Sequence, residues 1–314
     1  MITRNASPES DQLGRPAAAP VSGLLNIDKP QGMTSHDVVA IVRRIARQRQ
    51  VGHAGTLDPL ATGVLIVVLG AATRVVEYVA DADKVYRAII RFGLTTDTWD
   101  AEGSITGQRD ASGLSLAIIE QALSAFVGEI QQVPPMYSAI KRDGQPLYKL
   151  ARRGLTVERQ PRTVVIHRLH IEDWSPPDLT LCIECSKGTY VRSLAHDLGQ
   201  AVGSGAYLAA LTRLAVGQFR LEDAVSLAML QQGAASGAWR QHLLPLHLAL
   251  CRLPGIMVDG DTARRIGFGQ AVELPGPVDA DTCYAYTRDE RFLALLHRDA
   301  VDGLWHPHKV LLSL

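Results

Sequence analysis

The chain has 314 residues, with 46% hydrophobic and 20% charged side chains and a formal net charge of zero. It is long enough for one large and one small domain, and its composition is typical of a globular protein. Its neutral charge excludes a uniformly basic nucleic-acid binder, and its longest apolar run, at 64–69, is too short to cross a membrane.

Positive charge is nevertheless concentrated in two segments. Basic runs are more often solvated faces than binding sites, but two of them beside motif-rich segments favour a polyanionic partner. One follows an early helix and the other spans residues 141–168: Arg43, Arg44, Arg47 and Arg49, then Lys141, Arg142, Lys149, Arg152, Arg153, Arg159, Arg162 and Arg168.

In chain order, residues 1–21 lack the apolar core of a signal peptide, so we expect a disordered tail on a cytoplasmic protein. Thr34 is a candidate N-cap, with Asp37 in the first turn of a helix that runs to about Ala46. The apolar run at 64–69 predicts a buried strand. A short helix at 72–79 and a strand at 85–92 follow.

The middle of the chain begins with an insertion at 95–107 that is rich in Asp, Gly and Thr, followed by an amphipathic helix at 116–126. Residues 133–154 resemble a loop, and loops often carry binding. We predict strands at 163–171 and 179–185, a helix at 191–201 and a last strand of the large unit at 213–219. Strands and helices without strict alternation favour an α+β fold.

The C-terminal part begins with a helical stretch at 223–250 and a linker at 251–255. Short strand-like pieces follow at 284–286, 292–296 and 309–312, separated by Gly, Pro and Asp. This pattern predicts a small β-rich barrel or half-barrel.

Cys182 and Cys185 have the C-x-x-C spacing of a metal or redox pair. They lie in a predicted strand, however, where residues three apart point to opposite faces. No second Cys/His pair follows at zinc-finger spacing. We therefore expect structural cysteines and no metal site.

Local features leave each candidate catalytic residue with two interpretations. Asp58 lies in a glycine-bracketed loop before an apolar strand, but Asp-Pro is also a common turn. Tyr86 shares a strand face with core residues. Arg192 begins a helix, where the dipole disfavours a cation and an anionic partner is needed. Lys29 and His53 fit an ordinary surface charge and a packed imidazole as well as functional roles.

Five motifs identify a protein family when they are taken together and in order, although none does so alone. They are G-x-L-N-I-D-K-P-x-G-x-T-S (23–35), G-H-x-G-x-L-D-P-L-A-T-G (52–63), K-x-Y-R (84–87), P-P-x-Y-S-A (134–139) and S-K-G-T-Y-V-R-S-L (186–194). Over residues 22–220 the chain closely resembles the TruB family of bacterial tRNA pseudouridine 55 synthases. The C-terminal segment shows a weaker resemblance to the PUA-type RNA-binding domain of this family, and its near-neutral charge predicts little phosphate-driven affinity.

The resemblance implies a catalytic domain at 22–250, built on a mixed, mainly antiparallel sheet with a basic RNA-binding insertion at about 131–160. A PUA-like domain is implied at 251–314. The implied reaction isomerises uridine 55 of the tRNA T-loop. The N1–C1′ bond breaks, the uracil rotates and a C5–C1′ bond forms. No group is gained or lost, so no cofactor is expected.

The resemblance also assigns the catalytic roles. Asp58 is the carboxylate at the ribose, which adds to C1′, stabilises oxocarbenium charge or acts as a base at C2′. Arg192 pairs with this carboxylate and keeps it ionised in a dry pocket. Tyr86 stacks on the flipped uracil. Its phenol could assist proton removal at C5, although an ordinary pKa of about 10 suits that poorly.

Further residues are expected to bind substrate or to support the site. His53 fills the gap that the flipped base leaves, Lys29 and Pro30 support the active-site loop, and Tyr190 lies in the pocket wall. Phosphates of the T-arm are expected to be held by basic residues of the insertion: Lys149, Arg152 and Arg153.

The expected partner is therefore tRNA, bound through its T-arm by a monomer without a guide RNA and away from membranes. Two alternatives stay open. One is an RNA-folding chaperone that uses the same cleft, which would need no desolvated carboxylate. The other is an N-glycosidase acting on nucleosides, which would leave the basic insertion unexplained.

Overall fold

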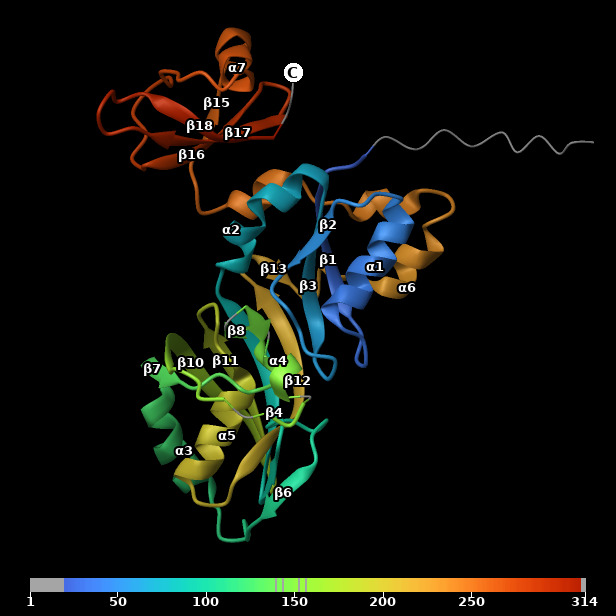
Figure 1. Cartoon of the computed structure of the whole chain (residues 1–314), viewed down its shortest axis with the longest axis vertical. Helices are drawn as coiled ribbons and strands as arrows, with labels where there is room; N and C mark the ends of the chain where they lie inside the picture. The colour runs from blue at the N-terminus through green and yellow to red at the C-terminus, as the bar shows by residue number, and fades with distance from the viewer. Residues whose placement is uncertain (1–19, 139, 143, 152, 156, 312–314) are drawn as a thin grey trace, which may run out of the picture.

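The computed structural model describes residues 20–138, 140–142, 144–151, 153–155 and 157–311. The tail predicted at 1–21 lies almost entirely outside these residues. A ten-stranded sheet forms the centre, in the order β14-β1-β3-β12-β4-β11-β10-β7, with β2 on β3 and β13 on β12 (Figure 1). Its strands are β1 (Gly23–Lys29), β2 (Val51–Ala54), β3 (Thr62–Leu69), β4 (Lys84–Phe92), β7 (Gly128–Gln132), β10 (Arg162–Ser175), β11 (Asp178–Cys185), β12 (Ala206–Val216), β13 (Phe219–Arg220) and β14 (Val225–Ser226).

This sheet is mixed, because β1 pairs with β14 and β3 with β12 in parallel, while its other pairings are antiparallel. The predicted α+β class with a mainly antiparallel sheet is confirmed. Two small hairpins accompany it: β5 (Leu94–Thr96) with β6 (Ile105–Gln108), and β8 (Lys141–Arg142) with β9 (Gln145–Pro146).

Helices cover both faces of the sheet, so β3 is buried on both sides. Leu65, Val67 and Leu69 join one core, while Val64, Ile66 and Val68 join the other. The first core also contains side chains of α1 (Ser35–Ala46), α3 (Leu116–Leu123), α5 (Val191–Ala201) and α6 (Leu227–Gln232). The second contains side chains of η1 (Gly70–Val75), α2 (Val76–Ala80) and η4 (Leu246–Leu250). The remaining short helices are η2 (Ser124–Phe126), α4 (Leu147–Ala151) and η3 (Ala238–His242).

The beginning of α1 follows the sequence prediction. Thr34 is the N-cap and forms a capping box with Asp37, which satisfies two backbone donors of the first turn. The helix at 191–201 also matches α5. The strand predicted at 213–219 begins too late, because β12 already begins at Ala206. Residues 206–211 are rich in Ala and Leu, which favour helix, but pairing with β4 holds them extended.

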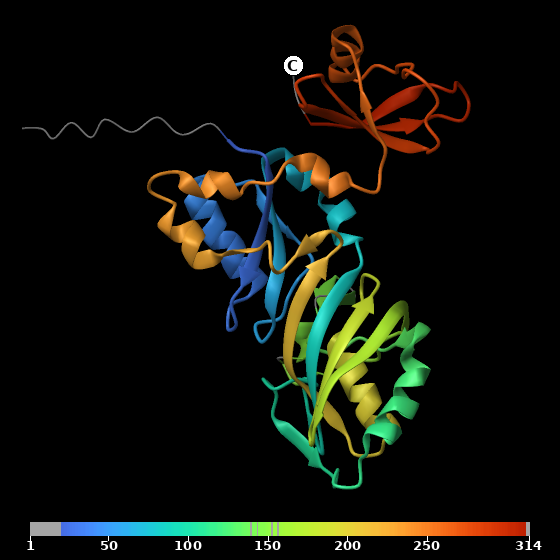
Figure 2. The ribbon, with the colours of Figure 1, turned by 180° about the vertical axis from the view of Figure 1, so that it is seen from behind.

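A separate four-stranded sheet with its own apolar core forms the C-terminal unit, in the order β15-β16-β17-β18. It lies beyond α2, at the end of the molecule away from α3 and α5 (Figure 1, Figure 2). Lys309 of β18 forms an ion pair with Glu77 of α2. The elements are β15 (Gly255–Met257), α7 (Gly260–Gly267), β16 (Thr282–Tyr286), β17 (Phe292–Arg298) and β18 (Trp305–Val310), so the last strand begins earlier than the predicted 309.

Candidate active site

Asp58 lies in the loop between β2 and β3, at a point where the sheet divides. Residues Ile66 to Leu69 of β3 pair with β2, whereas Thr62 and Gly63 pair with β12. The loop therefore occupies the place where the two neighbours of β3 diverge. A strand that changes partner leaves room for a loop to present a side chain at the sheet.

The turn before α1 fixes both neighbours of Asp58. Ser35 Oγ accepts a hydrogen bond from the Leu57 N–H at 2.8 Å and donates one to the Leu57 carbonyl at 3.2 Å. The Gly32 N–H donates to the Pro59 carbonyl at 2.8 Å. The turn of 29–35 thus holds the residues on either side of Asp58, which accounts for the link between the first two sequence motifs.

Lys29 stabilises this turn from inside the protein. Its side chain is fully buried, and Nζ donates to the carbonyls of Pro30 at 2.9 Å, Met33 at 2.6 Å and Pro59 at 3.5 Å. Burial lowers the pKa of Lys29 to about 8, although the nearby Asp58 carboxylate opposes this. The contacts support the loop-stabilising role expected for Lys29 and Pro30.

Arg213 of β12 joins the two ends of the same loop. Its Nε donates to the Val64 carbonyl at 2.7 Å and its Nη2 to the Gly55 carbonyl at 3.1 Å, and the residue is 1% exposed. A Cβ on Gly63 would lie 2.3 Å from the Arg213 carbonyl oxygen, so only glycine fits there. Arg213 is not among the residues that the sequence predicts for the site.

Arg192, at the start of α5, lies between two carboxylates. Nη2 is 3.0 Å from Asp58 Oδ2, and Nη1 is 3.5 Å from Asp100 Oδ2. The guanidinium also donates to the carbonyls of Tyr137 at 2.8 Å and Thr98 at 3.4 Å. Arg192 is 5% exposed, so these acceptors compensate the desolvation of its charge.

The pKa of Asp58 lies above its usual range. Burial is the main cause, the Arg192 guanidinium opposes it, and the Asp100 carboxylate adds to it. The side chain of Asp58 is nevertheless 36% exposed, against 4% for Asp100. Asp58 is therefore the carboxylate of the pair that a bound molecule can reach.

Tyr86 and Tyr190 lie within electrostatic range of Asp58. Burial is the main cause that raises the pKa of each phenol, and the Asp58 charge adds to it. Tyr86 is 8% exposed and is the cross-strand partner of Arg213. A raised pKa makes the Tyr86 phenol a poor proton acceptor near neutral pH. Tyr190 caps α5, and its backbone exchanges two hydrogen bonds with the Gln132 side chain.

His53 packs against a second histidine, His36. Its ring meets His36 edge to face at a centroid distance of 5.3 Å, and its Nδ1 is buried without a hydrogen-bond partner among the described residues. Burial, with smaller contributions from His36 and Arg213, lowers the pKa of His53 to about 4. The imidazole is thus neutral near pH 7, which suits packing rather than phosphate binding.

Two cations of the basic insertion are exposed to solvent. Lys149 on α4 and Arg153 just after it are exposed, whereas Arg152 lies outside the described residues. The segment predicted as loop at 133–154 contains α4 and the β8–β9 pair as well. Arg43, Arg44, Arg47 and Arg49 are also exposed, at and after the end of α1.

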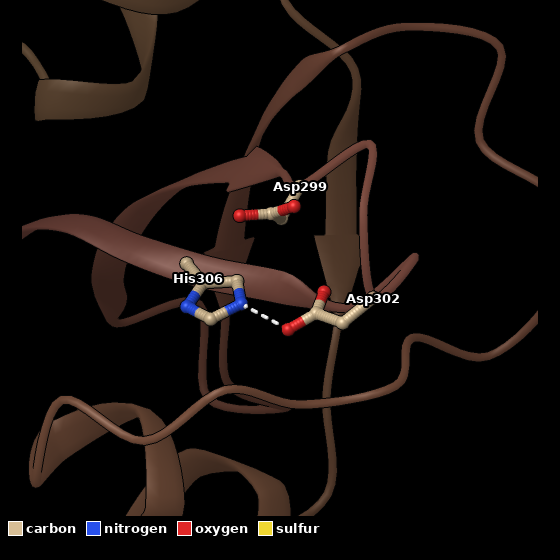
Figure 3. Close-up of side chains that lie close together, drawn as sticks. All are labelled: Asp299, Asp302 and His306. Atoms are coloured by element: carbon tan, nitrogen blue, oxygen red, sulfur yellow. Dashed lines mark hydrogen bonds and ion pairs between the residues drawn. The ribbon is translucent and has the colours of Figure 1, made fainter.

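Cysteines, carboxylates and a histidine are the candidate metal ligands. Cys185 is buried and Cys182 is half-buried on β11, and both are free thiols. Within the described ranges, one group has ligand spacing: Asp299 and Asp302 in the β17–β18 turn with His306 at the start of β18 (Figure 3). Asp302 and His306 pair at 2.9 Å, and the Asp299 and Asp302 carboxylates each accept a backbone N–H of the turn. These contacts explain the group as turn structure.

Sequence patterns miss two residues of this site, Asp100 and Arg213. Asp100 lies in the Asp-, Gly- and Thr-rich insertion, where an acidic residue predicts only a turn. The available signal for Arg213 was a single arginine within a mainly apolar run of Ala and Leu. Among the described residues, no helix has the length and apolarity needed to span a membrane.

Comparison with known proteins identifies the family of the chain. The profile of the TruB family pseudouridylate synthase N-terminal domain matches residues 43–191, and that of the tRNA pseudouridylate synthase B C-terminal domain matches 192–251. The tRNA pseudouridine synthase B of Dehalococcoides mccartyi is 44% identical over 92% of this chain and 96% of its own length. That of Symbiobacterium thermophilum is 49% identical over 81% of this chain and 84% of its own.

Solved structures give the same assignment of fold. A Cbf5-Nop10-Gar1 complex contains a chain that is 26% identical, with a TM-score of 0.70, covering 92% of this chain and 85% of that one. A chain in an H/ACA RNP bound to a substrate RNA has the same TM-score at 24% identity and covers the same shares. The chain belongs to the TruB family of pseudouridine synthases.

Proposed function

We propose that this protein isomerises a uridine of tRNA to pseudouridine and that Asp58 is its catalytic carboxylate. The main support for this proposal is the Asp58–Arg192 ion pair at 3.0 Å, in which the arginine is buried and the carboxylate remains 36% exposed. Simple RNA binding does not require a carboxylate that is paired with a buried arginine. The names of the curated relatives, at 43–49% identity, support the same reaction.

The reaction needs a carboxylate at the ribose and no change of oxidation state. The N1–C1′ bond breaks, the freed uracil turns, and C5 bonds to C1′ while C5 loses its proton and N1 gains one. Asp58 acts as the nucleophile at C1′ or as the base at C2′. Arg192 orients it and favours the ionised form against the cost of burial. Tyr86 supplies an aromatic face for the base.

The substrate segment we propose is the T-arm, with position 55 as the target. A base inside a folded RNA must be flipped out, which costs a few kcal/mol. Exposed cations of the insertion, Lys149 and Arg153, are suited to offset this cost through phosphates, and neutral His53 is suited to fill the vacated space. The monomer binds without a guide RNA and works in the cytoplasm, where tRNA is modified. Residues 22–250 form the catalytic domain and 251–314 the PUA-like one.

The test is tritium release from a tRNA transcript labelled with [5-³H]uridine, because the C5 proton leaves only when the new bond forms. We expect release by the wild type and a loss of about 10³-fold or more in Asp58→Asn. Asp178→Asn is the matched control, because Asp178 pairs with Arg91 at 2.6 Å on another part of the sheet. No release by the wild type would refute the proposal. If Asp58→Asn binds tRNA normally but is inactive, binding and catalysis are separate.

A further inference from the structure

Trp99 directly precedes Asp100 and has an unusual backbone. Its φ is 64°, in the left-handed region that a bulky aromatic residue rarely adopts. The turn around it is tightly closed, because a Cβ on Gly103 would lie 2.2 Å from Thr98 Oγ1. Strain of this kind persists only where surrounding contacts impose it. Backbone hydrogen bonds hold part of this turn, because the Trp99 N–H donates to the Thr96 carbonyl at 3.3 Å and the Trp99 carbonyl accepts from the Leu208 N–H at 3.0 Å. The contacts of the Trp99 ring add to these bonds.

The Trp99 ring contacts a histidine and an arginine. It stacks on His196 of α5 with a centroid distance of 4.3 Å and an interplanar angle of 13°. The Arg159 guanidinium carbon lies 5.4 Å from the ring centroid. Arg159 also donates to the Pro134 carbonyl at 3.1 Å, so it links the ring to the segment that begins the basic insertion.

The geometry of α5 connects this stack with the active site. Arg192 and His196 are four residues apart on the helix and so share one face. Arg192 contacts Asp100, and His196 contacts Trp99. Two consecutive residues of the turn, Trp99 and Asp100, thus contact two side chains that lie one helical turn apart on the same face of α5.

Close packing on all sides does not explain the position of the Trp99 ring. Trp99 and His196 line a cavity of about 240 Å³, together with Thr95, Arg109 and Gln200 among others. Because open space adjoins the ring, its stacking on His196 and its contact with Arg159 restrict its orientation. A tryptophan that merely filled a core would have no such cavity beside it.

We propose that Trp99 is a positioning residue, whose ring, held by His196 and Arg159, fixes the turn of 97–103 so that Asp100 meets Arg192. This inference rests on the proposed function, since the Asp100–Arg192 contact matters for the reaction through Asp58. The contact of Arg159 also makes the basic insertion part of the support for this turn.

The test compares variants that separate the ring from the backbone. Trp99→Gly removes the ring and relieves the positive φ, while Trp99→Phe keeps an aromatic ring. We expect kcat for tritium release to fall about tenfold in Trp99→Gly, with KM for tRNA within about twofold of wild type, and to recover in Trp99→Phe. Trp174→Ala, which removes the edge-to-face pair of Trp174 with Phe92 on β4, is the control. Wild-type kcat in Trp99→Gly, or an equal reduction in Trp99→Phe, would overturn the inference.

Two further measurements keep the test decisive. If Trp99→Gly does not fold, His196→Ala and Arg159→Ala each remove one of the two ring contacts. A fall in kcat supports the inference, and wild-type kcat in both overturns it. Thermal unfolding of Trp99→Gly, Asp100→Asn and the double variant needs no catalysis. Additive reductions in stability reject the role of Trp99, whereas absence of tritium release by the wild type rejects only the proposed function.

Discussion

Arg192 bridges Asp58 and Asp100, with distances of 3.0 Å and 3.5 Å, and the two carboxylates differ in access to solvent. The guanidinium can balance only part of the two negative charges. Each neighbour of Asp58 therefore changes its pKa in a known direction: Arg192 lowers it and Asp100 raises it. The arrangement makes the ionisation of Asp58 depend on both.

The acidic limb of the pH–rate profile should report this arrangement. In the proposed role Asp58 acts in its ionised form, so we expect activity to appear as pH rises through its pKa. Arg192→Gln removes the cation and should move the acidic limb of kcat/KM to higher pH. Asp100→Asn removes a like charge and should move it to lower pH, although misalignment of Arg192 lowers the maximum rate. Tritium release between about pH 5 and 9 measures both, and shifts in the same direction would contradict the assignment.

A second prediction concerns the tie between β12 and the Asp58 loop. Arg213→Met preserves the apolar length of the side chain but leaves the Val64 and Gly55 carbonyls without their donor. We expect the free energy of unfolding to fall by about 2–3 kcal/mol, and kcat to fall because Asp58 is no longer held. Urea denaturation and tritium release check the two effects. Arg220→Met, at an exposed position of β13, is the control, and an equal effect there would contradict the role of Arg213.

The sequence predicted those parts of the fold whose signals are local. The capping box of Thr34 and Asp37 located α1, and alternation located β4 around Tyr86. Motif similarity, rather than any local feature, singled out Asp58 and Arg192. Asp100 could not be found in this way, because its place beside Arg192 depends on a pairing of Asp100 with Leu208, more than a hundred residues away. Such long-range pairings leave no periodic signal in the chain.

A third prediction concerns the effect of neutral His53 on stability. Its pKa is about 4 in the folded protein against 6.5 for the free side chain. The unfolded state therefore takes up a proton first as pH falls, so this group destabilises the fold progressively between pH 6.5 and about 4. In His53→Gln, Tm should fall less than in the wild type between about pH 7 and 5. Calorimetry over this range measures the difference.

His297→Gln, on an exposed part of β17, is the matched control for the removal of one histidine. If His53→Gln follows the wild-type pH dependence of Tm, the imidazole is not held neutral by burial. If the variant also binds tRNA as tightly as the wild type, the proposed contact of His53 with the vacated T-loop position is wrong.

A fourth prediction tests the basic insertion as the phosphate-binding surface. Lys149 and Arg153 are exposed, and each phosphate that they bind should release counterions. In the variant with both changed to Ala, tRNA binding should weaken. The negative slope of log K against log[salt] should become less steep, by about 1 for each phosphate no longer bound. Filter binding from about 50 to 300 mM salt measures this. Changing Arg87 and Arg91 to Ala alters net charge equally, but these side chains are paired with Glu172 and Asp178. An equal change of slope in both double variants would mean that net charge, and not this surface, governs binding.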